Sequence, residues 1–274
     1  MFPFFFLSSA YLKKLIVKNK CLCIIFSILF SNTICSQAII DTESSLKKID
    51  STFHVFADFM GDQKTGNFKF NFLRSDITLG SRIKNDLFRI TFSYSSSKLN
   101  GNNFDKKMNF QFRWNKMLNE DFSLFMFLQT GESKRSFIDE RTLIGIGLRQ
   151  HIYKKDKNYF DIAVGPFYEF ESYPEYKFEN INFDGFSQKT TRISFNIFSS
   201  VKLFENITSA TTLYSQWKYN EIRDVRVFAN QYIRFKINEK ISTYIKYVVS
   251  YRSINYVKSL KNDTDFMYGF EINI

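Results

Sequence analysis

The strongest constraint on the fold is an alternation of apolar and polar side chains that recurs from residue 51 to residue 274. It is cleanest at the C-terminus, where apolar Phe266, Tyr268, Phe270, Ile272 and Ile274 are separated by Met267, Gly269, Glu271 and Asn273. A period of two places successive side chains on opposite faces of a β-strand. No helical period of useful length follows residue 50, so the sequence predicts an all-β chain.

Turn signals divide this pattern into segments of similar length. Clear examples are Gly66-Asn67, Asn100 to Asn103 and Asn238 to Lys240. Between such signals we predict about twelve strands, at residues 51–61, 67–83, 86–98, 107–117, 121–131, 140–153, 159–173, 188–203, 206–220, 224–237, 240–252 and 264–274. No linker or change in composition divides them, so we expect one domain.

The strand lengths favour a transmembrane antiparallel up-and-down β-barrel over a soluble sandwich. The predicted strands are longer than the five or six residues typical of soluble sheets, and a tilted strand needs about nine to eleven residues to cross the hydrocarbon. Tight turns such as 238–240 alternate with longer polar ones such as 173–188, the pattern of periplasmic turns and outer loops. The terminal strand also resembles the signal that the bacterial barrel-assembly machinery reads, with Ile274 where Phe is usual.

The first residues have the layout of an export signal. Lys13, Lys14, Lys18 and Lys20 precede an apolar run at 21–30, and a polar run with small residues follows at 31–37. We therefore predict a cleaved signal peptide at 1–37, a short N-terminal periplasmic segment at 38–50 and an outer-membrane β-barrel at 51–274. All three cysteines, Cys21, Cys23 and Cys35, lie in the signal segment, which excludes disulfides and cysteine chemistry from the mature chain.

The net charge of +11 arises from basic residues spread along the chain rather than gathered in a cluster. We therefore expect no nucleic-acid partner, because such binding requires a basic patch or stripe. The expected partners are outer-membrane lipid and the general export and barrel-assembly machinery. The oligomeric state is left open by the sequence.

Alternation places many charged side chains on the predicted inner faces. The candidate lumen-facing basic residues are Arg89, Arg113, Arg141, Arg149, Arg192, Arg234 and Lys246, with Lys69, Lys202, Lys218, Arg226 and Arg252 in the same phase. The predicted inner acids are Asp161, Glu169, Glu171 and Glu271. Two interpretations stay open: a salt-bridged interior that plugs the barrel, or an open lumen whose positive excess favours anions.

The two histidines, His54 and His151, are also predicted to face the lumen, away from the lipid face where a lipase dyad would act. Gly145 and Gly147 form a lone G-x-G inside a strand, without the third glycine and helix of a dinucleotide site. We interpret these glycines as room for bulky neighbours or for strand curvature. We expect no catalytic residues, no metal and no cofactor.

Several stretches between residues 56 and 173 resemble one known family. They are FADFMGDQKTGNFKFNF, NDLFRITFSYSSSKLNG, LFMFLQTGESKRSFIDERTLIGIGLRQHIY and DIAVGPFYEFESY. Together they resemble the domain of unknown function 481, the family labelled as salt-induced outer-membrane proteins. The resemblance implies an outer-membrane barrel and implies no reaction.

Two functions follow from these patterns. The first is a structural or envelope-stress barrel of the outer membrane that does not conduct. The alternative is a narrow pore for small solutes that favours anions.

Overall fold

The computed structural model describes residues 53–66, 69–134, 136–156, 158–178, 181–254 and 262–273. The predicted signal peptide, the segment at 38–50 and Ile274 lie outside these residues. The strands are β1 (His54–Lys64), β2 (Phe70–Ile83), β3 (Asp86–Leu99), β4 (Asn102–Met117), β5 (Phe122–Ser133), β6 (Ile138–Lys155), β7 (Asn158–Tyr173), β8 (Tyr176–Phe178), β9 (Ile181–Phe183), β10 (Phe186–Lys202), β11 (Ile207–Lys218), β12 (Glu221–Lys236), β13 (Ile241–Arg252) and β14 (Asn262–Asn273).

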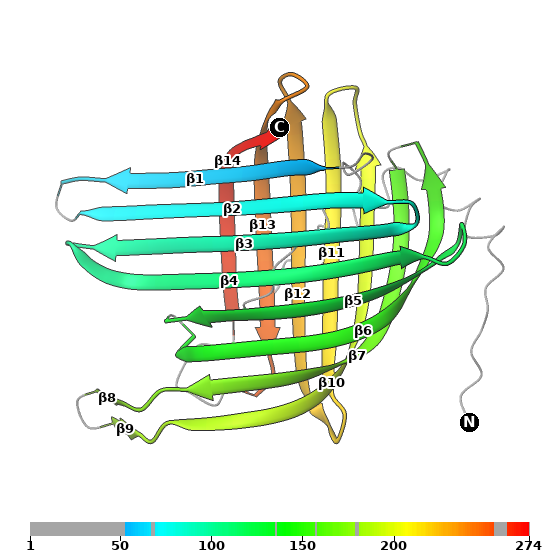
Figure 1. The fold of residues 1–274 in the computed structure, drawn as a ribbon. Helices are drawn as coiled ribbons and strands as arrows, with labels where there is room; N and C mark the ends of the chain where they lie inside the picture. Colours follow the sequence, from blue (N-terminus) through cyan, green and yellow to red (C-terminus); the bar gives the residue numbers. More distant parts are fainter. Residues whose placement is uncertain are drawn as a thin grey trace.

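Twelve of these strands form one closed antiparallel barrel (Figure 1). Each strand pairs with the next barrel strand along the chain, β7 pairs with β10 across the β8–β9 hairpin, and β1 pairs with β14. This confirms the predicted all-β fold and the strand number. The short β8–β9 hairpin lies inside the predicted long loop between Tyr173 and Gln188 and was not predicted. Strands of three residues are too short to show an alternation.

The two ends of the barrel differ in their connections. At one end, called the turn end, the strands are joined by residues 84–85, 118–121, 156–157, 203–206 and 237–240. The opposite end, called the loop end, carries the two longest connections, at 174–185 and 253–261. The first residue of β1 and the last of β14 are both at the turn end.

Local chemistry explains several of these turns. Asn100 and Gly101 join β3 to β4 with positive φ angles of 51° and 87°, the geometry of a two-residue hairpin for which Asn-Gly is favoured. At the turn end the Asn238 side-chain oxygen accepts hydrogen bonds from the amides of Lys240 and Ile241 at 2.9 and 2.8 Å. Asparagine makes such a turn because its side chain imitates the backbone.

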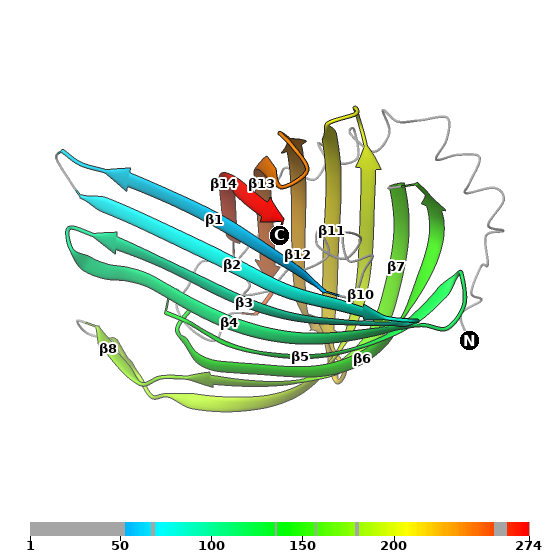
Figure 2. The same ribbon diagram turned by 45° about the horizontal axis from the view of Figure 1, so that its top comes forward.

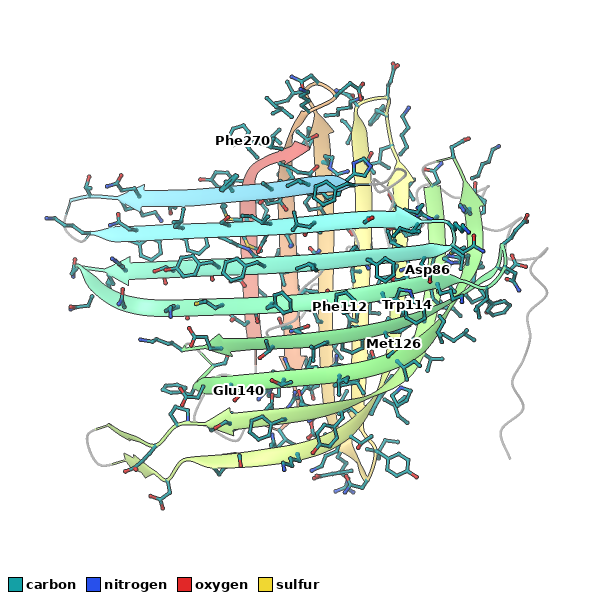
Figure 3. The ribbon with its side chains drawn as sticks, in the orientation of Figure 1. Asp86, Phe112, Trp114, Met126, Glu140 and Phe270 are labelled. Carbon is teal, nitrogen blue, oxygen red and sulfur yellow. The ribbon has the colours of Figure 1, made fainter. Side chains whose placement is uncertain are left out.

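The polarity of the two faces of the barrel is the reverse of that in a soluble protein, because apolar side chains lie outside and polar side chains lie inside. Large apolar side chains such as Ile144 and Phe195 are 54% and 37% exposed. Phe270, which is 60% exposed, lies on the outside (Figure 3). Buried polar and charged side chains outnumber buried apolar ones inside. Trp114 lies near the turn end, where its indole nitrogen donates a 2.8 Å hydrogen bond to Asp86.

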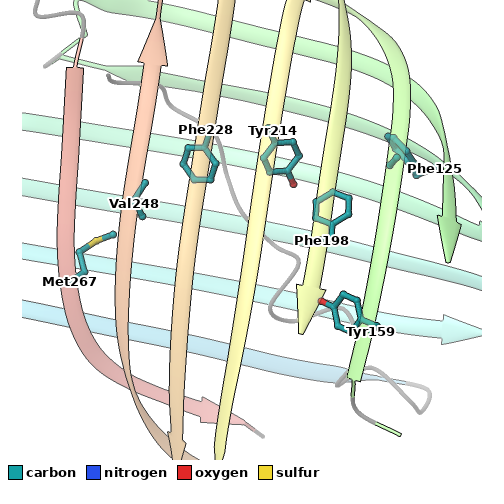
Figure 4. Packing of buried hydrophobic residues seen from close by; sticks show 8 residues of the cluster. Phe125, Tyr159, Phe198, Tyr214, Phe228, Val248 and Met267 are labelled. Atoms are coloured by element: carbon teal, nitrogen blue, oxygen red, sulfur yellow. The ribbon is translucent and has the colours of Figure 1, made fainter. Parts of the chain in front are cut away.

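An apolar cluster lines the lumen along the consecutive strands β7 and β10 to β14, with Phe125 added from β5. Its buried members are Phe125, Tyr159, Ala163, Phe198, Tyr214, Phe228, Val248 and Met267 (Figure 4). Glycines make room for it: a Cβ at Gly145 would lie 2.5 Å from the Phe127 ring, and one at Gly147 would overlap Phe125. The space that these glycines were predicted to leave is therefore filled by aromatic rings.

Candidate functional site: the charged lumen

A group of fully paired charges lies in the loop-end half of the lumen, on the wall from β6 to β13. We call it the arginine–glutamate network, and it consists of Arg141, Glu169, Glu171, Tyr173, Arg192, Asp224, Arg226 and Arg252. Glu169, Glu171, Arg192 and Arg226 are fully buried. Such burial is tolerated only when each charge has close partners.

Glu169 is the centre of the network because three guanidinium groups converge on it. Arg141 Nη2 and Arg226 Nη1 each lie 2.6 Å from Glu169 Oε1, and Arg192 Nε lies 2.7 Å from Oε2. The other side of the Arg192 guanidinium contacts Asp224 at 2.8 Å. One carboxylate thereby ties β7 to β6, β10 and β12.

Glu171 lies two residues along the same strand and faces the same way. It contacts Arg226 at 2.8 Å and Arg252 at 3.1 Å, and it accepts hydrogen bonds from Tyr173 at 2.9 Å and Gln188 at 2.7 Å. Arg226 therefore bridges both glutamates. These partners occupy both oxygens of each of the two carboxylates.

A second basic group lies in the turn-end half. Arg89 donates to Asn115 Oδ1 at 3.3 Å, and Arg113 lies over the Phe125 ring at 4.8 Å. Arg149 contacts Asp161 at 2.7 Å and covers the Phe198 ring at 4.4 Å. Stacking of this kind suits a buried guanidinium, which is planar and weakly hydrated. All three arginines are at most 4% exposed.

Beside this group, Ser123, His151 and Asp161 lie next to one another in the spatial order of a hydrolase triad. His151 Nε2 lies 3.2 Å from Ser123 Oγ, and His151 Nδ1 lies 3.1 Å from Asp161 Oδ1. Sequence reasoning missed this arrangement, because Ser123 and His151 meet only through the β5–β6 register. Ser123 is 2% exposed and Asp161 also binds Arg149, so the geometry offers a nucleophile no route to substrate.

The remaining candidate residues lie apart from these groups. Arg234 contacts Glu271 at 2.8 Å near the turn end, and Lys246 lines a cavity near the loop end. His54 stacks on Phe56 with the ring centres 5.9 Å apart. The prediction for Lys69 is wrong: it precedes β2, is exposed, and has the odd numbering of the outward residues Asn71 and Leu73.

The cavity is the second feature of the loop-end half, on the wall from β13 through β1 to β5. Its volume is about 410 Å³. The charged side chains among its described lining residues are Asp62, Arg74, Asp76, Asp105, Lys107, Lys246, Asp263 and Asp265. Among these described residues, five carboxylates therefore face three cations, so the lining of this one cavity is acidic.

Most of these cavity residues, and Asp224 of the network, were absent from the predicted inner set. The signal was available for three of them, since Asp224 has the phase of Arg226, and Arg74 and Asp76 have the phase of buried Thr78.

Among the described residues, no three His, Cys, Asp or Glu side chains form a group that could hold a metal ion. No helix in that part of the chain is long and apolar enough to cross a membrane.

Comparison of the whole sequence with family models identifies the chain. The model described as protein of unknown function, DUF481, matches residues 57–273, which is nearly all of the barrel. The chain belongs to the DUF481 family. The resemblance seen in the sequence is thereby confirmed. No curated protein matches this DUF481 member.

Solved structures share the architecture of this DUF481 barrel at low sequence identity. The translocator domain of the autotransporter NalP from Neisseria meningitidis is 9% identical, with a TM-score of 0.51, and the match covers 84% of this chain and 92% of that one. The NanC porin is 11% identical, with a TM-score of 0.47 and coverage of 80% and 98%. At such identities the likeness concerns the fold alone.

Proposed function

We propose that this DUF481 member is an outer-membrane β-barrel whose lumen is closed by its own side chains. We propose further that it has a structural role in the envelope rather than acting as a pore or an enzyme. The observation that supports the membrane proposal is the reversed polarity of the barrel, with apolar side chains outside and charged side chains inside. Exposed apolar side chains such as Ile90, Phe112 and Ile146 surround buried charges. Lipid is the solvent that suits such an outer face, and a polar lumen is typical of outer-membrane barrels.

The closed lumen is supported by the filling of its cross-section. The apolar cluster covers the wall from β7 to β14 with buried side chains, and the arginine–glutamate network fills one side of the loop-end half with buried charges. The alternative, a pore that favours anions, has less support. The network pairs its arginines with carboxylates, and carboxylates predominate around the cavity.

Gel mobility tests membrane residence. Protein extracted from separated outer membranes should migrate fast in SDS without heating and near its true mass after boiling, because a closed barrel resists SDS. A protein found in the soluble periplasmic fraction, with no such shift, would contradict the proposal.

Planar-bilayer recording tests the closed lumen. The purified barrel should give no steady conductance above that of the bare bilayer. Stable conductance steps that favour anions would contradict the closed lumen and support the pore.

Growth of cells that lack the protein tests the envelope role. These cells should differ from the parent in detergent sensitivity or in growth at raised salt, and unchanged behaviour in both would contradict that role.

A further inference from the structure

The outer faces of β10 and β12 change from apolar to charged as these strands approach the loop end. Ile193 of β10, Trp217 of β11 and Val225 of β12 form one row across the wall, because Trp217 pairs with both of the others. The next outward charged side chains toward the loop end are Lys189 on β10 and Arg223 on β12, and both are exposed. The three strands lie side by side in the wall (Figure 2).

Alternation along each strand directs both of these cations away from the lumen. Lys189 precedes the inward residue Thr190, which is 6% exposed. Arg223 precedes the inward residue Asp224, which is 1% exposed and belongs to the arginine–glutamate network. Because successive side chains of a strand point to opposite faces, Lys189 and Arg223 point outward.

Two exposed carboxylates on this part of the wall have other partners. Glu221 binds Lys218 at 2.9 Å. Glu140, on β6, accepts a 3.1 Å hydrogen bond from Thr142 and lies two strands away from β10. Within the described ranges, neither of the two outward cations forms an ion pair. They can therefore bind an anion from outside the protein.

Aromatic side chains beside the cations indicate the level of a membrane interface. Tyr168 of β7 pairs with Thr191 of β10, and the Tyr219 amide donates to Thr191 O at 3.0 Å, so the two tyrosines lie at one height. Tyr168 is 43% exposed and Tyr219 is 75% exposed. Tyrosine and tryptophan concentrate where hydrocarbon meets the lipid headgroups. Lys189, two residues beyond Thr191 toward the loop end, therefore lies at the level of the headgroups.

Phosphate is the headgroup anion that suits this pair of cations. A guanidinium binds phosphate through two parallel hydrogen bonds, and a lysine ammonium binds it as a point charge. Each basic side chain near an anionic lipid surface strengthens association roughly fivefold. One strand separates β10 from β12, so their axes lie about 10 Å apart, a spacing that suits two phosphates on one headgroup.

We propose that Lys189 and Arg223 bind the phosphates of a bisphosphorylated glycolipid in the membrane leaflet at the loop end, while its hydrocarbon chains cover Ile193 and Val225. The longer loops of an outer-membrane barrel face the exterior, so this leaflet is the outer one. The inference rests on the proposed membrane residence. It goes beyond that proposal by assigning a lipid class and the side chains that select it.

Native mass spectrometry of the purified full-length mature barrel in a non-ionic detergent tests the site. Lipid A with two phosphates should bind at least about tenfold more tightly than the same lipid without its phosphates. Lys189→Gln with Arg223→Gln should weaken binding of the phosphorylated lipid roughly twentyfold, because two contributions of about fivefold are lost. Lys69→Gln with Lys98→Gln is the matched control. These two lysines are exposed at the loop end far from β10 around the wall, so their loss should leave the binding unchanged.

Three results would overturn the site. Equal binding of the two lipids by the unsubstituted protein would contradict it, even if the double variant fails to fold. An equal loss in both double variants would show a diffuse effect of surface charge rather than a site. Excess inorganic phosphate should leave the lipid bound, and displacement of the lipid would show that the cations select free phosphate.

The gel-mobility assay separates the two proposals. A heat-modifiable outer-membrane protein without a preference for the phosphorylated lipid would refute the lipid site and leave the membrane barrel intact. A soluble protein without heat-modifiability would refute both.

Discussion

At the scale of single residues, Glu169 is the group on which the lumen depends most. It is fully buried and accepts from Arg141, Arg192 and Arg226. Glu169→Gln removes the charge and leaves three guanidinium groups partly uncompensated, and breaking a buried ion pair costs about 3–5 kcal/mol. We expect a loss of that size in the free energy of unfolding, measured by urea titration of the heat-modifiable band. Glu205→Gln, in an exposed turn, should change it by less than about 0.5 kcal/mol; equal effects would mean that the network contributes nothing.

The Ser123–His151–Asp161 arrangement gives a second prediction at this scale. Because Ser123 is buried, we expect a fluorophosphonate probe to label neither the native chain nor Ser123→Ala. The comparison should be made on the folded barrel, with a serine hydrolase as the positive control. Labelling that disappears in Ser123→Ala would show that the lumen admits a substrate and would reopen the enzyme hypothesis.

At the scale of the strands, β6 and β7 approach closely because glycines face the lumen from both. A Cβ added at Gly165 would overlap the backbone oxygen of Ile146. Gly165→Ala should therefore destabilise the barrel by about 1–3 kcal/mol, as overpacking does. Gly61→Ala is the matched control, since its Cβ would meet Phe72 O at an ordinary 3.5 Å. The same urea titration measures both variants, and a neutral Gly165→Ala would show that the two strands can separate freely.

At the scale of the whole molecule, the outer apolar surface distinguishes a membrane barrel from a soluble one. Ile144 is 54% exposed in the middle region of β6, and Ile83 is 56% exposed at the last position of β2. In lipid vesicles Ile144→Lys should cost about 2–4 kcal/mol, and Ile83→Lys about 0–1 kcal/mol, because the penalty falls toward the interface. In a soluble barrel both substitutions would be near neutral. Urea titration of both variants in vesicles decides between them.

The sequence by itself determined the strands, their number and the face of most side chains. Alternation is a local property, and Arg89, Arg192 and Glu169 lie inward because they share the phase of their neighbours. The error at Lys69 comes from the end of a strand, where the phase cannot be checked on both sides. The signal segment lies outside the described residues and stays a prediction.

Only the tertiary structure decided which inward groups meet. The three partners of Glu169 come from β6, β10 and β12, and His151 reaches Ser123 only through the register of two strands. The same is true of the seam, where β1 and β14 pair over four residues and then diverge. Registers and closure depend on contacts between segments far apart in the chain, whereas the alternation along one strand contains no information about its partner.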